Sequence, residues 1–458
     1  MLLYFKADNY KSFQKDLFLD LRPAPRITDL HYSVLKEPIG SKDYKALCSA
    51  VIYGPNAAGK TNIISAADTL KAIVLRGNIK NEPGFNSSQT EHQNIASQLL
   101  EYIPNRFLSE KEHTTFKIEF IHEQKLFEYE LEISLGGFLN RNFERRVVKE
   151  ALKVNESFIF IRTDHVEMPL LSKKAVRNLF SREIADHAVM FLKIANENLG
   201  QQDLFLTGGF KSIFNKKLAE SVMEWFEKKF LIVMKSNQIT MTPPSELLTP
   251  GTIITEPVLN KIAQEFGIHN NRIGYQTNEK NGEIDVLSVL TSDDEGEKPI
   301  VVNANYYESF GTIRMLNIFP AVLTALDKGA TLIVDELDAS IHPVAIINLL
   351  NIFHNDDINV HKAQLIFNTH NPIFMNGNVL RRDEMKFVDR KSGESSETYS
   401  LADFGTSGVG AVRKNEDYMS NYFADKYGAV TELDFSDIIA ALLKERGTNE
   451  EANSKTDK

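Results

Sequence analysis

One eight-residue segment constrains this chain more than any other. Residues 54–61 read Gly-Pro-Asn-Ala-Ala-Gly-Lys-Thr, which fits the pattern GxxxxGK[ST] at every fixed position. Glycines let successive backbone N–H groups curl around an anion without interference from Cβ atoms. The lysine suits β- and γ-phosphates, and the hydroxyl that follows suits Mg²⁺. The segment predicts a phosphate loop, whose ligand contacts come from consecutive residues: Gly54, Pro55, Asn56, Ala57, Ala58, Gly59, Lys60, Thr61 and Asn62.

The flanks of the phosphate loop agree with this interpretation. Residues 46–53 are almost wholly apolar, which is typical of a buried strand in a parallel sheet. After the loop, apolar residues recur on one helical face and a glycine at position 77 supplies a stop: Ile63, Ala67, Leu70 and Val74. We therefore expect strand, loop and helix in direct succession.

A second apolar strand, at residues 331–334, ends in two carboxylates. Strands and helices alternate from residue 300 to residue 368, which predicts a parallel sheet with its ligand at the carboxyl ends of the strands. Both acids would then lie beside the bound phosphates. We expect Asp335 to hold Mg²⁺ through water and Glu336 to polarise the attacking water.

Three further segments surround this acidic strand. Asp338 follows it in the run Leu-Asp-Ala-Ser-Ile-His-Pro, and His370 closes the next apolar strand. Ser309 and Gly311 stand at the start of the preceding helix, where N–H groups can face an anion. Read alone, His370 is an ordinary turn histidine and Ser309 an ordinary N-cap. Their order around the acidic strand favours a role at the phosphates.

The remaining chain divides into two kinds of segment. Alternating apolar residues predict an antiparallel hairpin over 116–133, with its turn at 122–125 and more strands near 143–161. Residues 165–270 read as mainly helical and carry a stripe that we expect to be packing surface: Phe214, Leu218, Val222, Phe226 and Phe230. We predict four segments, two halves of one head with an insertion and a tail: 1–162, 163–282, 283–432 and 433–458.

Composition narrows the function classes. The 458 residues carry a formal net charge of −10, so bulk attraction does not draw the protein to nucleic acid. The net charge does not exclude a local basic face. Cys48 is the single cysteine, which excludes an intramolecular disulfide and a CxxC metal site. No stretch approaches the ~18 apolar residues of a membrane span. We expect a soluble, cytoplasmic protein without a membrane partner.

The order of these motifs resembles ABC-type ATPases of the SMC, RecF and OLD kind. Residues 9–13, Asn-Tyr-Lys-Ser-Phe, are similar to the opening segment of such heads, and residues 413–430 to their end. The resemblance spans about 1–135 and 295–430, and is closest to compact bacterial defence ATPases of the RloA/AbiL and PARIS type. It implies an α/β fold, a P-loop NTPase head of the ABC type. The head implied by the resemblance has a mixed or parallel sheet, an antiparallel β subdomain and a helical insertion in place of a long coiled coil.

The resemblance also implies cofactors, partners and residue roles. Two heads of a homodimer would sandwich two ATP molecules with Mg²⁺, the phosphate loop of one chain facing Ser309 and Gly311 of the other. Asp338 in the D-loop would monitor the opposite site, Glu336 would be the base, and His370 the switch histidine. The segment 308–312 reads Glu-Ser-Phe-Gly-Thr rather than LSGGQ, and the Q-loop glutamine has three candidates: Gln89, Gln93 and Gln98. The OLD relatives carry a TOPRIM nuclease after the switch histidine; too few residues follow His370 for one here.

Three hypotheses for function follow. The first is that ATP closes the homodimer, or a larger assembly, and so controls a separately encoded nuclease or toxin in anti-phage defence. The second is a RecF-like clamp on DNA in repair or maintenance, for which the sequence offers two basic clusters: Lys173, Lys174 and Arg177, and Lys211, Lys216 and Lys217. The third is a scaffold that binds ATP with little turnover, against which Glu336 argues.

Overall fold

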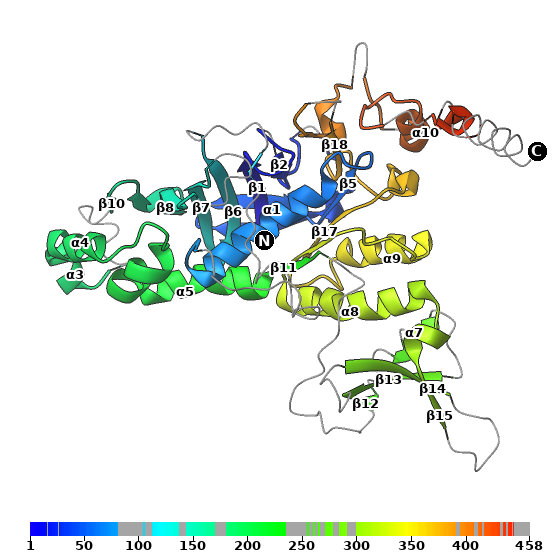
Figure 1. The fold of residues 1–458 in the computed structure, drawn as a ribbon, viewed down its shortest axis with the longest axis horizontal. Coiled ribbons are helices and arrows are strands. Elements are labelled where there is room, and N and C mark those ends of the chain that lie inside the picture. Colours follow the sequence, from blue (N-terminus) through cyan, green and yellow to red (C-terminus); the bar gives the residue numbers. More distant parts are fainter. Residues whose placement is uncertain are drawn as a thin grey trace, which may run out of the picture.

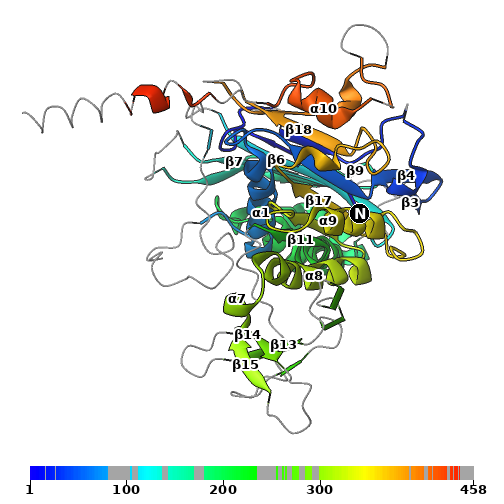
Figure 2. The ribbon, with the colours of Figure 1, turned by 90° about the vertical axis from the view of Figure 1, so that its right-hand side faces the viewer.

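The computed structural model describes residues 1–80, 104–105, 112–136, 143–169, 180–234, 254–255, 260–261, 264–265, 271–277, 284–290, 299–390, 394–406, 411–430 and 434–443, apart from residues 16, 26, 415, 437 and 442. Two large sheets lie one above the other with helices between and beside them, and a smaller sheet projects from the far end (Figures 1 and 2). None of the described helices is long and apolar enough to cross a bilayer.

The central sheet positions the site. Its strand order is β11-β16-β17-β5-β18-β19. The strands are Phe230–Val233 (β11), Thr331–Val334 (β16), Gln364–Asn368 (β17), Ser49–Tyr53 (β5), Met385–Asp389 (β18) and Glu397–Ser400 (β19). All neighbouring pairs are parallel except β18 with β19. The carboxyl ends of β5, β16 and β17 therefore meet at one edge, as the sequence predicts.

The second large sheet is antiparallel and has the order β10-β9-β8-β7-β6-β1-β2. Its strands are Leu2–Asp8 (β1), Leu17–Asp20 (β2), Thr114–His122 (β6), Lys125–Ser134 (β7), Arg146–Val154 (β8), Ser157–Arg162 (β9) and Val166–Glu167 (β10). The turn between β6 and β7 has positive φ angles at Glu123 (46°) and Gln124 (56°), which match the twist of a tight hairpin. The predicted hairpin is confirmed.

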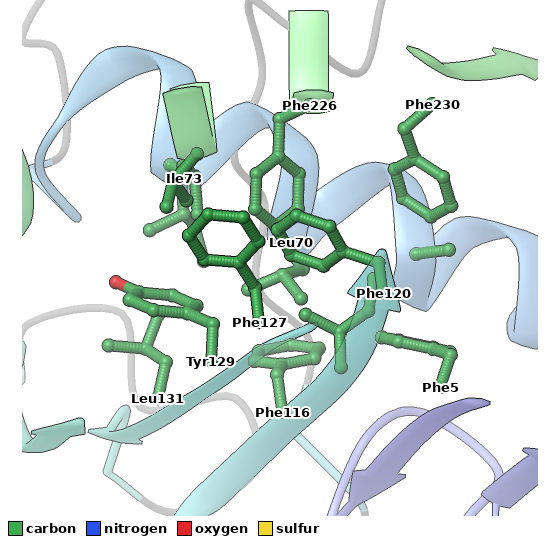
Figure 3. Close-up of a cluster of buried hydrophobic side chains, with 14 of the residues drawn as sticks. Phe5, Leu70, Ile73, Phe116, Phe120, Phe127, Tyr129, Leu131, Phe226 and Phe230 are labelled. Atoms are coloured by element: carbon green, nitrogen blue, oxygen red, sulfur yellow. The ribbon is translucent and has the colours of Figure 1, made fainter. Parts of the chain in front are cut away.

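Two cores lie on the two faces of the central sheet. Along β5, Ala50 and Ile52 join one core, and Val51 and Tyr53 the other, because successive side chains point to opposite faces. The first core packs α1 (Lys60–Arg76) against the antiparallel sheet, where aromatic rings of β6, β7 and the helical segment meet Leu70 and Ile73 (Figure 3). The second core lies under α8 (Phe310–Lys328) and α9 (Pro343–Phe353). This α/β arrangement confirms the predicted fold class.

The helical segment follows β10 and lies at the left in Figure 1. It contains Arg182–Asp186 (α3), Ala188–Glu197 (α4), the π-helical Leu206–Phe214 (η4), Lys216–Glu224 (α5) and the π-helical Trp225–Lys229 (η5). Every residue of the predicted packing stripe is at most 4% exposed: Phe214, Leu218, Val222, Phe226 and Phe230. That part of the prediction is confirmed.

The segment 165–270, predicted as mainly helical, also contains the strands β10, β11 and Ile254–Thr255 (β12), of which β11 belongs to the central sheet. The apolar residues Phe230–Val233 form β11, which pairs in parallel with β16 at the edge of the central sheet. Residues 231–233 are all β-branched or leucine, and they suit a half-buried edge strand. The chain thus rejoins the central sheet well inside the predicted insertion 163–282. The four segment boundaries themselves stay a prediction.

The smaller elements complete the fold. A four-stranded sheet of Ile254–Thr255 (β12), Asn271–Thr277 (β13), Ile284–Leu290 (β14) and Ile300–Asn303 (β15) projects beyond α8, and Ala304–Tyr307 (α7) links the two (Figure 1). Val34–Ile39 (β3) pairs with Lys42–Leu47 (β4). The single strand predicted at 46–53 is therefore divided at Cys48 between β4 and β5. Near the C-terminus lies Tyr418–Phe423 (α10).

A buried polar cluster lies at the amino end of the central sheet. Glu384 Oε1 accepts a hydrogen bond from Ser49 Oγ at 2.7 Å and contacts His354 Nε2 at 3.2 Å, while Oε2 accepts from the Arg381 N–H at 2.7 Å. Cys48 lies beside these groups, and burial raises the pKa of its thiol well above the usual value. The cluster joins the starts of β5 and β18 to the end of α9, far along the strands from their carboxyl ends.

Candidate nucleotide-binding site

The phosphate loop runs from the end of β5 to the start of α1 and is tightly enclosed. A Cβ at Gly54 would lie 2.3 Å from the Val388 carbonyl oxygen, and one at Gly59 would lie 2.6 Å from Ser12 Oγ. Gly59 also has a φ of 118°, a conformation that L side chains rarely adopt. Both glycines of the motif are therefore required by space as well as by backbone conformation.

Two segments distant in sequence support the loop. Asn62 Nδ2 donates to Ser12 Oγ at 2.8 Å, and Ser396 donates through its N–H to the Ser12 carbonyl at 2.8 Å and through Oγ to the Ala58 carbonyl at 2.5 Å. The segment 9–13 singled out in the sequence thus contacts the loop directly. Ser396 was missed, because nothing in the local sequence distinguishes it from other serines.

Lys60 extends back along the loop. Its Nζ donates to the Gly54 carbonyl at 2.7 Å and the Pro55 carbonyl at 3.0 Å, and the residue is only 5% exposed. Burial lowers the pKa of Lys60 to about 8, while the carboxylates of Glu336 and Asp335 act in the opposite direction. A buried ammonium of this kind would gain from a phosphate polyanion at the loop.

Thr61 and Asp335 bring the two halves of the chain together. Thr61 Oγ1 donates to Asp335 Oδ1 at 3.0 Å, although 274 positions separate them in the sequence. Asn368 Nδ2 donates to the same oxygen at 2.5 Å and orients the carboxylate. A hydroxyl and a carboxylate oxygen are the hard ligands that Mg²⁺ prefers, so these two residues fit a magnesium site.

Glu336 and His370 face each other beside that pair. Glu336 Oε1 lies 3.9 Å from His370 Nε2, and both side chains are about half exposed, at 52% and 47%. His370 Nδ1 lies 3.4 Å from Lys60 Nζ. Burial lowers the pKa of His370, and the charge of Lys60 lowers it further, so a neutral imidazole is favoured. The acid, the histidine and the lysine therefore surround one space.

Asp338 lies close to His370, whereas Ser309 and Gly311 lie at the start of α8, where their hydrogen bond and close packing involve Thr312 and Ser340 rather than the phosphate loop of this chain. Thr369 Oγ1 donates to Asp338 Oδ2 at 2.7 Å, and burial raises the pKa of that carboxyl. Ser309 caps α8 by accepting from the Thr312 N–H at 3.2 Å, as its sequence position predicts. Gly311 packs against the D-loop (residues 337–343) of its own chain, at Ser340.

Two contacts were not anticipated from the sequence. Asn368 binds Asp335 through Nδ2 and accepts from the Glu336 N–H through Oδ1. Arg314, on the second turn of α8, donates to the Glu336 carbonyl. Asn368 stands two residues before His370, at the end of a predicted strand, and that position was the available signal. Arg314 offered none, because a buried arginine within a helix is not recognisable locally.

The predicted Q-loop residues and the basic clusters of the DNA-binding hypothesis gain no support from the structure. The Q-loop candidates Gln89, Gln93 and Gln98 and the basic cluster Lys173, Lys174 and Arg177 lie outside the described residues. In the other basic cluster, Lys211 and Lys216 both lie within 4 Å of the Glu220 carboxylate, at 3.6 and 3.9 Å. Since that acid offsets part of their charge, the DNA-binding hypothesis stays a prediction.

A protein-family model matches residues 49–376, which include the phosphate loop, the acidic strand and the segment around His370. The model describes an AAA domain, putative AbiEii toxin, Type IV TA system. The chain belongs to this family. The AAA-domain family assignment agrees with the observed P-loop NTPase fold. The matched region contains every predicted site residue from Gly54 to His370, and the supporting residues Ser12 and Ser396 lie outside it.

Three SMC heads are among the solved structures that are similar to this AAA-domain protein. The SMC head domain from Thermotoga maritima is 12% identical with a TM-score of 0.35, covering 87% of this chain and 98% of that one. An Smc head bound to the C-winged helix domain of ScpA is 13% identical, covering 87% and 97%, with a TM-score of 0.33. A Pyrococcus furiosus Smc head bound to the C-terminal domain of ScpA is 13% identical, covering 87% of this chain and 96% of that one, with a TM-score of 0.33. No curated protein matches.

Proposed function

We propose that this chain binds ATP with Mg²⁺ and hydrolyses it at the carboxyl edge of β5, β16 and β17. The observation that carries the proposal is the 3.0 Å contact between Thr61 Oγ1 and Asp335 Oδ1. It joins a phosphate loop to an acidic strand tip, the two parts that nucleotide-hydrolysing P-loop proteins combine. Chance motifs in unrelated parts of a fold have no reason to meet in this way.

Each residue has a role in this proposal. The loop amides and Lys60 bind the β- and γ-phosphates, and Thr61 and Asp335 hold Mg²⁺, which when bound neutralises charge on the phosphate oxygens. Glu336 orients the attacking water and accepts its proton. Neutral His370, between Lys60 and Glu336, donates a hydrogen bond toward the γ-phosphate or that water. The segment from Gly54 to Asn62 supplies the remaining contacts.

Nucleotide binding and hydrolysis are tested separately. Mg-ATP should raise the melting temperature of the wild-type protein, because a ligand that binds only the folded state stabilises it. Lys60→Ala should abolish that rise, and Glu336→Gln should keep it while phosphate release falls by about 10²-fold or more. A wild-type protein with no ATP-dependent stabilisation, or a Glu336→Gln variant that hydrolyses at the wild-type rate, would refute the corresponding part.

We further propose that two chains close on ATP, with the phosphate loop of one facing Ser309 and Gly311 of the other. Support comes from α7 and the start of α8. N–H groups of the first turn of α8 favour an anion, and both helices carry an exposed aromatic ring. Phe310 is 79% exposed and Tyr306 is 93% exposed. A second chain over this surface would cover both rings. Glu336→Gln with ATP should run as a dimer by light scattering, whereas Ser309→Arg should bind ATP and stay monomeric.

The output of this cycle is proposed to be control of a separately encoded effector, a nuclease or toxin, in bacterial anti-phage defence. The family description, with its putative toxin and Type IV TA system, supports a setting of this kind. The resemblance to RloA/AbiL-type and PARIS-type ATPases points the same way. Phage challenge of cells that carry this gene with its neighbours, beside cells carrying Lys60→Ala, tests the role; equal plaque counts would refute it.

A further inference from the structure

The guanidinium of Arg314 occupies a position between two parts of the site. Arg314 lies on α8, five residues after the N-cap Ser309, and is 9% exposed. Its Nη2 donates a hydrogen bond to the main-chain carbonyl of Glu336. A helix whose first residue, Phe310, is exposed is thereby bonded directly to the backbone of the residue that would activate water.

The backbone of Glu336 needs such support. Its φ is +50°, in the left-handed region that non-glycine residues adopt only rarely. The Glu336 N–H donates to Asn368 Oδ1, and its carbonyl accepts from Arg314 and, at 3.1 Å, from the Ala339 N–H. Both ends of the residue are fixed by hydrogen bonds, and the direction of its side chain depends on them.

The same helix also contacts the D-loop. A Cβ at Gly311 would lie 2.2 Å from the Ser340 carbonyl, so the start of α8 has no clearance to shift against residues 338–341. The carboxylates of Glu336, Asp338 and Asp335 also oppose the lowering of the Arg314 pKa by burial. The backbone of Arg314 therefore moves with α8, while its guanidinium is bonded to the acidic tip of β16.

We propose that Arg314 is a positioning residue, which couples the placement of the α8 start to the orientation of Glu336. The inference rests on the proposed ATPase function and specifies its regulation. When a second chain contacts Ser309 and Gly311, the position of α8 is fixed, and the hydrogen bond from Arg314 carries that position to the Glu336 carbonyl. Hydrolysis would then depend on contact at the outer surface of α8 in the same chain, whereas ATP binding would not.

The test compares Arg314→Met and Arg314→Lys with Lys328→Met, which removes an exposed cation from the far end of the same helix. Steady-state ATP hydrolysis is measured over a series of Mg-ATP concentrations up to saturation, which gives kcat and KM. Rates are expressed per folded molecule. We expect Arg314→Met to lower kcat by about 10²-fold with little change in KM, since a misplacement of about 1 Å can cost that much. Arg314→Lys should recover only part of kcat, and Lys328→Met should match wild type.

Binding and assembly are measured on the same proteins. Arg314→Met in the Glu336→Gln background should retain ATP-induced stabilisation and the ATP-induced dimer. Wild-type kcat in Arg314→Met would overturn the inference and leave the ATPase proposal standing, and so would a lower melting temperature with kcat per folded molecule unchanged. If Arg314→Met does not fold, Arg314→Lys decides alone: wild-type kcat overturns the coupling, and a reduced kcat at constant KM supports it. No hydrolysis by wild type would instead defeat the proposed function.

Discussion

Gly311 stands so close to Ser340 that a Cβ at position 311 would lie 2.2 Å from the Ser340 carbonyl oxygen. Gly311 lies in the first turn of α8 and Ser340 belongs to the D-loop, so the contact joins two segments that are separated in the sequence by the rest of α8 and by β16. The φ of Ser340 is +63°, which means that the loop already has an unfavourable backbone conformation there. Any side chain at position 311 must displace this loop or tilt the helix.

Gly311→Ala is therefore expected to destabilise the protein by roughly 1–3 kcal/mol, as overpacking usually does, and to lower ATP hydrolysis as well. The control is Gly208→Ala, because a Cβ at Gly208 meets nothing within 4 Å. That glycine lies inside helix η4, where alanine is favoured by ~1 kcal/mol or less. Urea unfolding of both variants measures the difference; equal stability would contradict the packing argument.

Lys60 predicts a pH dependence. Its pKa falls from 10.5 to about 8 on burial, so between these values the unfolded chain binds a proton that the folded chain has released. Stability then rises with pH across this window, by on the order of 3 kcal/mol for this group. Below pH 8 the folded state carries the full cost of the buried charge.

Lys60→Met isolates this effect, because the other titrating groups are common to both proteins. Without nucleotide, the variant should be more stable than wild type at pH 7, and its advantage should shrink as pH rises toward 10. Urea unfolding at several pH values provides the measurement. A pH-independent difference between the two proteins would show that Lys60 is charged to the same extent in both states.

The sequence predicted those parts of the fold whose cause is local. The phosphate loop, α1 and its stop at Gly77 follow from consecutive residues, and Gly77 indeed ends the helix with a φ of 74°. The run 46–53 could not reveal the break at Cys48, because apolar residues suit both β4 and β5, and only their different partner strands separate them. Likewise, Phe230–Val233 is a strand because it pairs with β16, which lies about 100 residues later in the chain.

The candidate site shows the same division. Thr61, Asp335, Glu336 and His370 belong to short motifs at strand ends, and parallel strands bring such ends together without further information. Arg314 and Ser396 act through single side chains that reach the backbone of other segments. Contacts of this type depend on the packing of complete elements, which periodicity and spacing do not encode.

Glu384 predicts the cost of disturbing the buried cluster. Its carboxylate is fully buried. It accepts hydrogen bonds from Ser49 Oγ and the Arg381 N–H, and it contacts His354 Nε2. Glu384→Ala would leave buried polar groups without their acceptor, so we expect a loss of ~1–3 kcal/mol for each group that stays unsatisfied. Glu397→Ala, at an exposed position of β19, should stay within about 0.5 kcal/mol of wild type. Chemical denaturation distinguishes them; similar midpoints would mean that the cluster contributes nothing.

Thr61 and Asp335 predict a coupled loss of magnesium dependence. If both hold one cation, Mg²⁺ should increase the ATP-induced rise in melting temperature for wild type and for Thr61→Ser, which keeps the hydroxyl. Thr61→Ala and Asp335→Asn should each lose most of that increase, and the double variant should lose little more, because residues that share one partner are not additive. Binding of ATP in EDTA should change little, since Lys60 and the loop amides remain. Strictly additive losses would mean that the two side chains act on different groups, and the 3.0 Å contact between them would then be structural alone.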